Sequence, residues 1–482
     1  MKTPFLGASY MARSPNAAAD VCMNLFPEAI PHGGKETGAL YRAPGTATLV
    51  TLGSGPIRGA WQFGDYAYVV SGSTLYRVKA DWGTRVLGTV TGSGPVSMAD
   101  NGTQLFVACG TNAFIYNAST EVFAQITDPD FPGASVVGYI DGFFVFIQPD
   151  SQRLWQTALL DGTSIDPTEF ASAEGSPDGL VSLIVDHREI WLFGTRSVEV
   201  WYDVGGADFS FAPIQGAFIE TGCAAAFSVS KMDNSVYWLG QDQRGSGIVY
   251  RANGYTPQRI STHAVEYDIA QISATYGISD AISYTSQEEG HSFYVLTFPA
   301  GNRTWGYDAA TGLWHQRSYR VNATNTLIRH RSNCYTFYQG KHVVGDFENG
   351  NLYEMSMGIY ADAGQLQKWT RAWRALPTGG NNLNRTFQHS LQIDCETGVG
   401  LDGDQQGDNP QVFLEWSDDG GHTWSNEHWR SMGRIGEYGL RVIYRRLGST
   451  EKLRDRVYRL SGTDPVPITL LGAELHMSPG AN

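Results

Sequence analysis

The sequence predicts an all-β protein: a β-propeller of six or seven blades, preceded by an extended N-terminal arm and followed by a C-terminal β-sandwich. Three observations lead to this fold class. A hairpin-like phrase recurs seven times between residues 59 and 355, equivalent positions in these repeats are 38 to 57 residues apart, and most repeats are followed by a short strand with an aromatic residue. Small sheets repeated in this way bury their faces against neighbours around a common axis.

Each repeat has an apolar β-rich run, a turn with Gly, Asp or Asn, and a second run ending in an aromatic residue. The equivalent second-run positions are Tyr68, Phe106, Val145, Trp191, Tyr237, Tyr294 and His342. Their spacing is close to the roughly 40 to 50 residues of a four-stranded blade. An ordinary sandwich is disfavoured because the repeats occupy more than 290 residues. Whether the stretch before Gly59 closes the ring decides between six and seven blades.

The repeats divide the chain into three segments. Residues 1–50 are rich in Pro, Gly and Ala, and their X-Pro steps favour an extended arm with turns. Residues 51–357 form the predicted propeller. Residues 358–482 contain longer alternating strands, which predict a separate β-sandwich. Within this last segment, residues 365–373 are either a brief helix or a strand that crosses to the sandwich.

Composition indicates a folded, acidic protein. Aromatic residues make up 12% and charged residues 17% of the chain, as in a β-rich globular protein rather than a disordered one. A net charge of −14 opposes general attraction to nucleic acid or anionic membranes. The five cysteines are dispersed and odd in number, so we expect reduced thiols and synthesis in a cytoplasm. No apolar signal region begins the chain and no run of 18 apolar residues predicts a membrane anchor.

The common sequence motifs of catalysis, cofactor binding and metal binding are missing. There is no phosphate-binding Gly-x4-Gly-Lys-Ser/Thr motif, dinucleotide-binding glycine pattern, His-Glu-x-x-His, Cys-x-x-Cys or Gly-x-Ser-x-Gly. His422 and His428 are the closest loop pair near acids, and two solvated side chains are a simpler interpretation than a metal site. We therefore expect no catalytic residue, no cofactor, no metal and no enzymatic activity.

One turn in the predicted sandwich resembles the Asp-box of sialidases and related propellers. It follows the pattern Ser-x-Asp-x-Gly-x-Thr-Trp, with Ser417, Asp419, Gly421, Thr423 and Trp424. In such a hairpin turn the carboxylate accepts backbone N–H bonds, glycine takes a positive φ and Trp folds over the turn. We interpret it as a structural turn. A sialidase usually repeats the box in several blades, whereas here it occurs once and outside the propeller.

A basic stretch stands out in this acidic chain. Between residues 427 and 459, nine Lys and Arg residues occur with four Asp and Glu. The candidate partner interface within it consists of Arg445, Arg446, Lys452, Arg454, Arg456 and Arg459. These residues either dock an acidic partner or a phosphate backbone, or face solvent and pair with acids on neighbouring strands or subunits. A protein interface is favoured over DNA because no aromatic platform is interleaved with the charges.

Short motifs near both ends of the chain carry a resemblance to a known family. Near the N-terminus they are Gly-Ala-Ser-Tyr-Met-Ala-Arg-Ser (7–14), Ala-Asp-Val-Cys-Met-Asn-Leu-Phe-Pro-Glu (19–28) and Leu-Tyr-Arg-Ala-Pro-Gly-Thr (40–46). Near the C-terminus they are residues 416–424, 436–438, 445–448, 454–460 and 464–468. With these motifs the chain resembles the packaged-DNA stabilisation proteins, or tail nozzles, of short-tailed bacteriophages. Each piece is moderately specific, and their order over the whole chain is the stronger argument.

This resemblance implies a structural protein of the virion tail, made in the host bacterial cytoplasm. It implies a hexameric ring that extends the DNA channel below the portal and adaptor, helps retain the packaged genome and attaches the tail needle or plug, beside tailspike or fibre proteins. Genomic DNA would pass through the channel without sequence-specific binding, and a negative charge would keep the channel from holding it. We expect the arm or the sandwich to contact the adaptor.

The alternative function is a glycan-binding or sialidase-like propeller that acts on host surface polysaccharide. Hydrolysis would require two carboxylates about 5 to 10 Å apart in a cleft. Glycan binding would instead require aromatic side chains exposed on one face of the propeller. Turnover assays and glycan binding by the isolated chain distinguish both possibilities from a structural role.

Overall fold

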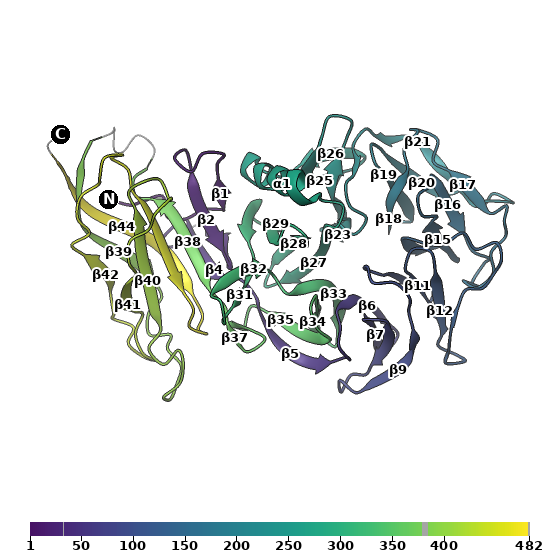
Figure 1. Cartoon of the computed structure of the whole chain (residues 1–482), viewed down its shortest axis with the longest axis horizontal. Helices are drawn as coiled ribbons and strands as arrows, with labels where there is room; N and C mark the ends of the chain where they lie inside the picture. The colour runs from purple at the N-terminus through teal and green to yellow at the C-terminus, as the bar shows by residue number, and fades with distance from the viewer. Residues whose placement is uncertain (32, 378–383, 481–482) are drawn as a thin grey trace.

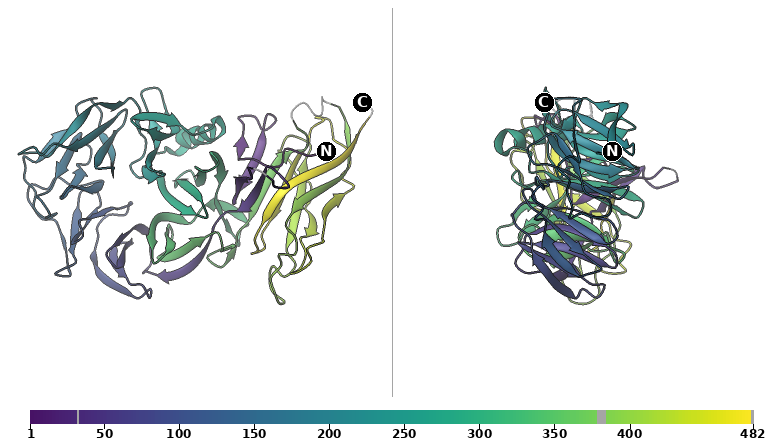
Figure 2. Two further views of the ribbon diagram at one scale, coloured as in Figure 1. Left: turned by 180° about the vertical axis from the view of Figure 1, so that it is seen from behind. Right: turned by 90° about the vertical axis from the view of Figure 1, so that its right-hand side faces the viewer.

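The computed structural model describes residues 1–31, 33–377 and 384–480. It is an all-β structure in which a ring of small sheets and a two-sheet sandwich lie next to each other along the longest axis of the molecule (Figure 1). Seen from behind, both chain termini lie at the sandwich end (Figure 2). Within the described ranges, no helix has the length and apolar character needed to cross a membrane.

The described residues form a propeller of seven blades. Blades 1 to 4 each have four antiparallel strands in chain order. Blade 1 contains β6 (Ile57–Phe63), β7 (Tyr66–Ser71), β8 (Thr74–Val78) and β9 (Thr84–Thr89), and blade 2 contains β10 (Ser97–Asp100), β11 (Gln104–Ala108), β12 (Ala113–Asn117) and β13 (Val122–Gln125). Blade 3 contains β14 (Val137–Ile140), β15 (Phe143–Ile147), β16 (Arg153–Gln156) and β17 (Phe170–Ser172), and blade 4 contains β18 (Leu180–Asp186), β19 (Glu189–Gly194), β20 (Val198–Asp203) and β21 (Phe211–Ile219).

Blades 5 to 7 repeat this plan with additions. Blade 5 contains β22 (Gly222–Cys223), β23 (Ser230–Met232), β24 (Ser235–Gln241), β25 (Ser246–Asn253) and β26 (Thr256–Arg259), and blade 6 contains β27 (Ile282–Glu288), β28 (His291–Phe298), β29 (Arg303–Asp308) and β30 (Leu313–Gln316). Blade 7 contains β33 (Ser332–Tyr338), β34 (Lys341–Asp346), β35 (Asn351–Ser356) and β5 (Gly45–Thr51), extended by β36 (Ala361–Asp362) and β37 (Gln365–Leu366). A separate hairpin is formed by β31 (Ser318–Val321) and β32 (Thr326–Arg329).

The seven equivalent residues of the sequence repeat all lie in the second strands of the blades, β7, β11, β15, β19, β24, β28 and β34. Most are buried, and aromatic residues of neighbouring blades meet between the sheets, as Tyr237 and Tyr294 do with ring centroids 5.6 Å apart. The prediction of a propeller is confirmed. Each blade is covered on both faces because its neighbours supply the apolar side chains that one small sheet lacks.

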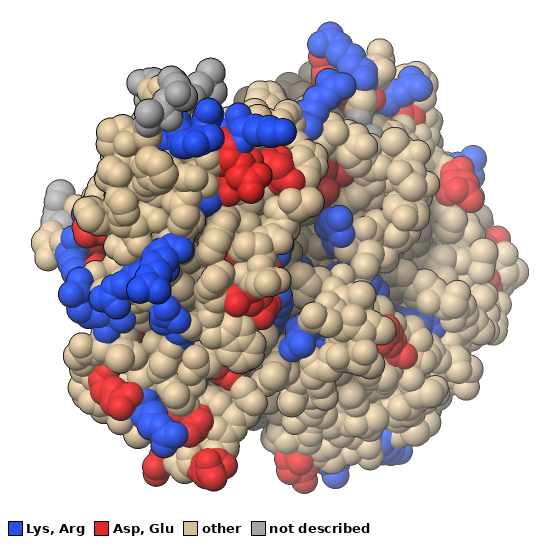
Figure 3. Space-filling model, turned by 60° about the vertical axis from the view of Figure 1, so that its left-hand side comes forward, with Lys and Arg blue, Asp and Glu red and all other residues tan. Residues whose placement is uncertain are grey.

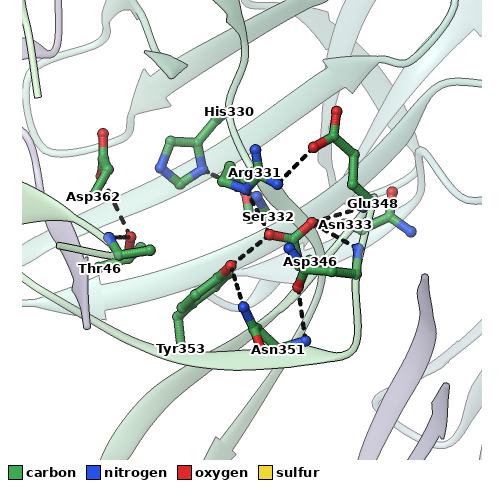
Figure 4. A network of polar contacts seen from close by, with 12 residues as sticks. Thr46, His330, Arg331, Ser332, Asn333, Asp346, Glu348, Asn351, Tyr353 and Asp362 are labelled. Carbon is green, nitrogen blue, oxygen red and sulfur yellow. Dashed lines mark hydrogen bonds and ion pairs between the residues drawn. The ribbon is translucent and has the colours of Figure 1, made fainter. Parts of the chain in front are cut away.

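The N-terminal segment closes the ring. Strand β5 pairs antiparallel with β35, with Thr46 opposite Met355 and Thr51 opposite Asn351, and becomes the outer strand of blade 7. Beside it, the buried carboxylate of Asp346 accepts bonds from Arg331 Nε and the Tyr353 hydroxyl, both at 2.6 Å (Figure 4). The ring therefore has seven blades, because a strand from the beginning of the chain supplies the outer strand of the blade that β33, β34 and β35 begin.

One helix interrupts the repeats. Helix α1 (His263–Tyr276) lies between blades 5 and 6, where the spacing of equivalent residues reaches 57. Thr262 caps its N-terminus by accepting a bond from the Val265 amide, and Gly277 follows it with a φ of 80°. Ile269 and Ile272 bury its inner face against the core of these two blades. The sequence pattern did not predict this helix.

The remaining N-terminal strands are extended, as expected, and are built into the sheets. Strand β1 (Tyr10–Met11) pairs with β2 (Ala19–Met23), which lies between β30 of blade 6 and β38 (Trp369–Arg374) of the sandwich. A single sheet thus continues from the propeller into the sandwich. The segment 365–373, for which a brief helix and a crossing strand were both considered, is strand in β37 and β38.

The sandwich has two sheets packed around one apolar core. One consists of β38, β43 (Val457–Gly462), β40 (Gln411–Ser417) and β41 (His428–Ser431); the other consists of β3 (Leu25–Ala29), β4 (Gly38–Arg42), β44 (Thr469–Pro479), β39 (Thr386–Cys395) and β42 (Val442–Arg445). Trp369 and Trp373 fill the core between them. The predicted sandwich is confirmed, and two of its strands come from the first 50 residues. The domain limits at 50 and 357 stay a prediction, since sheets cross both.

Candidate partner interface

The Asp-box-like turn connects β40 to β41 and is held by its own side chains. Asp419 accepts bonds from the amides of His422 and Thr423, both at 2.9 Å, and from the Thr423 hydroxyl at 2.6 Å. Ser417 donates to Asp419 at 2.6 Å and accepts the Gly421 amide at 2.8 Å. Gly421 has a φ of 101°. These bonds hold the pKa of the Asp419 carboxyl well below its ordinary value.

Two arginines of the basic stretch anchor this turn. Arg456 is 2% exposed and binds both carboxylate oxygens of Asp418, at 2.7 and 2.6 Å. Arg459 binds Glu415 in the same two-bond manner and lies 3.9 Å from the ring centroid of Trp424. Both guanidinium charges are paired with carboxylates of the sandwich, because a bidentate ion pair satisfies both groups. The turn and part of the basic stretch therefore form one structural unit.

The other candidate interface residues lie nearer the surface. Arg445, Arg446 and Lys452 are exposed, and Arg454 is partly buried. Arg445 ends β42, where it is opposite Ser390 of β39. The structure thus separates the six predicted residues into three exposed cations, one intermediate residue and two that stabilise the fold.

A basic surface follows the edges of the two sandwich sheets at β41 and β42. We name it the basic edge and define it as Arg430, Arg441, Arg445 and Arg446, all exposed. Arg430 donates to the Ile443 carbonyl at 2.9 Å, and Arg441 donates to the side-chain oxygen of Gln392. Neither neutral acceptor cancels the positive charge. Figure 3 shows Lys and Arg side chains gathered over the sandwich.

The negative charge of the chain is concentrated in one part of the propeller, which sequence analysis missed. Residues 117–222 hold 16 of the 48 Asp and Glu residues but only three Lys or Arg, whereas the rest of the chain has 32 acids and 31 bases. This segment contains blades 3 and 4, at the opposite end of the molecule from the sandwich (Figure 1). A count by segment, rather than over the whole chain, would have found it.

Four exposed acids of this end flank the outer strands β17 and β21: Asp166 and Asp208 precede the two strands, and Glu174 and Glu220 follow them. We name them the acidic rim and define it as Asp166, Glu174, Asp208 and Glu220. The two blades adjoin here, since a Cβ added at Gly175 would lie 2.8 Å from the Phe218 ring. Phe218 is itself 42% exposed, so the rim combines negative charge with accessible apolar surface.

A cavity of about 620 Å³ follows the propeller axis and is lined by the first strands of the blades. Asp100 is the one carboxylate among its described lining residues, and it accepts the Trp61 indole N–H at 2.8 Å. Lys231 donates to the Val185 carbonyl at 2.9 Å. This cavity lacks the carboxylate pair that glycoside hydrolysis requires. No cluster of three or more potential metal ligands occurs in residues 1–31, 33–377 and 384–480.

The architecture defines a class of protein: a seven-bladed propeller joined to a sandwich through strands of the N-terminal segment. Residues 1–360 match the family described as bacteriophage P22 Gp10, beta-propeller, and residues 368–478 match its partner description, bacteriophage P22 Gp10, beta-sandwich. The chain therefore belongs to the P22 Gp10 family. It is a bacteriophage structural protein of the tail and packaged-DNA stabilisation type, which confirms the family predicted from the sequence.

Solved structures that resemble the chain do so distantly. A streptogramin B lyase has 8% identity and a TM-score of 0.43, with 69% of this chain and 98% of the lyase covered. The N-terminal domain of Nup159 has 9% identity and a TM-score of 0.41, with 70% of this chain and 98% of that domain covered. No curated protein sequence matches the chain significantly. These structural likenesses carry no argument about function.

Proposed function

We propose that this protein is a non-enzymatic tail nozzle that forms a hexameric ring, extends the DNA channel below the portal and adaptor, and helps retain the packaged genome. The observation that supports the proposal most directly is the match to the two P22 Gp10 domains in order, over residues 1–360 and 368–478. On this basis the ring also attaches the tail needle or plug and contacts tailspike or fibre proteins.

The mechanical continuity of the fold suits such a wall element. Strand β2 joins blade 6 to the sandwich, and β5 closes the ring, so the first 51 residues bind both parts together. Buried Arg371 adds to this by donating to the Phe5 carbonyl at 2.6 Å and binding Asp20. A subunit held together in this way transmits load without separating its domains, as a channel under DNA pressure requires.

The charge distribution suits a channel that does not grip DNA. Outside residues 117–222 acids and bases nearly cancel, so the rest of the chain carries no net positive charge with which to hold the duplex along its length. DNA would contact this protein as it passes, with no reading of base sequence. The basic edge is local, and its four arginines are better matched to a protein partner than to a long duplex.

Imaging of virions tests this function. Tails from phage that carry the protein should show a six-fold ring with a central hole below the portal, and particles assembled without the protein should lose their DNA. Complementation with the wild-type chain is the matched control. Tails that lack any ring containing this protein, or particles that keep their genome equally well without it, would contradict the proposal.

A further inference from the structure

We propose that the basic edge of one copy binds the acidic rim of a second copy, so that the chains associate head to tail. The inference rests on the proposed ring and assigns its two contacting faces. The basic edge is Arg430, Arg441, Arg445 and Arg446 on the sandwich, and the acidic rim is Asp166, Glu174, Asp208 and Glu220 on blades 3 and 4.

The two surfaces carry opposite charges, which is the first observation in favour of this contact. Residues 117–222 contain 16 acids and three bases, and residues 427–459 contain nine bases and four acids. Within residues 427–459, Arg456 and Arg459 are already paired with carboxylates, but the four arginines of the basic edge have no carboxylate partner among the described residues. Opposite potentials of this kind steer two proteins together and disfavour like-charged contacts.

Exposed apolar side chains accompany both charged surfaces. Tyr202, Val204 and Phe218 near the acidic rim are 44%, 47% and 42% exposed. At the basic edge, Trp429 is 54% exposed and Tyr438 is 75% exposed. A lining that only repels DNA needs no aromatic or aliphatic side chains, whereas protein interfaces combine apolar contact with a charged periphery. The acidic rim is therefore assigned to a protein contact rather than to the channel wall.

The two surfaces cannot meet within one chain. The sandwich and blades 3 and 4 lie at opposite ends of the molecule in Figure 1 and in the left panel of Figure 2. Binding between them must join different copies, and each copy then uses two different faces. Such heterologous contacts generate a closed ring when the rotation between copies closes, and an open filament when it does not.

Charge reversal with rescue tests the contact in the full-length protein. One variant carries Arg441→Glu, Arg445→Glu and Arg446→Glu, and a second carries Glu174→Lys, Asp208→Lys and Glu220→Lys. Asp166 and Arg430 are left unchanged because their side chains bond to the local backbone or Thr168. Sedimentation over a range of concentrations should show association at least tenfold weaker for each variant, and recovery to within about threefold when all six changes share one chain.

Cross-linking locates the contact even when association is weak. In an Arg445→Lys, Arg446→Lys variant, a zero-length carbodiimide reagent should join position 445 or 446 to acids of the rim, and mixing of isotope-labelled and unlabelled chains should identify the links as intermolecular. Association that is unaffected by the two triple changes, failure of the six-fold change to restore it, or cross-links that map elsewhere would each overturn the proposal.

The outcome for this contact between copies can be distinguished from the outcome for the proposed nozzle function. Rings seen in virion tails together with normal association of both charge-reversed variants would leave the ring standing and remove this contact. Head-to-tail association that produces filaments without any tail ring would preserve the contact and remove the nozzle function. The salt response gives a further check, because contacts between exposed charges should weaken between 50 and 500 mM salt.

Discussion

Replacement of Asn24 should weaken the propeller and the sandwich together. Asn24 is 1% exposed and lies between β2 and β3, with a φ of 51°. Its side-chain nitrogen donates to the carbonyls of Ser318 at 2.9 Å and Lys368 at 2.7 Å, and its oxygen accepts the Ser318 amide at 2.9 Å. Ser318 follows blade 6 and Lys368 precedes β38, so one amide connects both parts of the chain.

The expected magnitude follows from these three bonds. Leaving a buried polar group without a partner costs about 1–3 kcal/mol, so Asn24→Gly should lower the free energy of unfolding by about 3–5 kcal/mol. Asn24→Ala should cost about 1–2 kcal/mol more, because alanine is strained at positive φ. The matched control is Asn325→Ala, since Asn325 has a φ of 53° but is exposed, and among the described residues its side chain bonds to Arg320 alone.

Denaturant unfolding, followed by tryptophan fluorescence and circular dichroism, measures the effect. Trp305 and Trp314 report on the propeller, and Trp369 and Trp373 report on the sandwich. Hydrogen exchange of the backbone amides of β29 and β38 separates the two parts of the chain, and both transitions should move to lower denaturant in Asn24→Gly. A loss no larger than that of Asn325→Ala, or a shift confined to one of the two domains, would refute the view that β2 joins them into one unit.

Three further predictions concern titratable groups. Asp419→Asn should lower the melting temperature at pH 7, and the difference from wild type should shrink as pH falls below 3.8. The reason is that the hydrogen-bonded carboxylate has a depressed pKa, and its stabilisation is lost on protonation. A difference in melting temperature that is independent of pH would contradict this. Burial raises the pKa of Asp362 to about 6. The free energy of unfolding of wild type should therefore fall relative to that of Asp362→Asn as pH rises from 3.8 to 6, by about 3 kcal/mol at most. Urea unfolding of both proteins at several pH values measures this, and two parallel profiles of unfolding free energy against pH would rule it out. Burial lowers the pKa of His315 to about 3, so stability should fall as pH drops below 6.5, by about 2 kcal/mol at pH 5, and His315→Gln should flatten that part of the profile measured by calorimetry.

Local pairing explains why the repeats could be read from the sequence. In each blade the second strand follows the first after a short turn, so the apolar runs and the Gly, Asp or Asn between them are contiguous, as at Asp141 and Gly142. In the sandwich, strand β39 alternates buried residues with more exposed ones, which is likewise visible in a short stretch of sequence. Helix α1 was missed because it buries only four of its 14 residues, which gives a weak helical period.

The sequence by itself therefore determined the fold class, the family resemblance and the local Asp419 turn, because these depend on residues close together in the chain. Tertiary structure alone decided that β5 pairs with β35, about 300 residues further along the chain, and that β2 joins the two domains. It also decided that Arg456 and Arg459 form ion pairs with carboxylates of the sandwich. Those outcomes depend on which strand edges and which charges the completed sheets leave unpaired. Local patterning does not encode that information, since a free edge accepts any strand that reaches it in register.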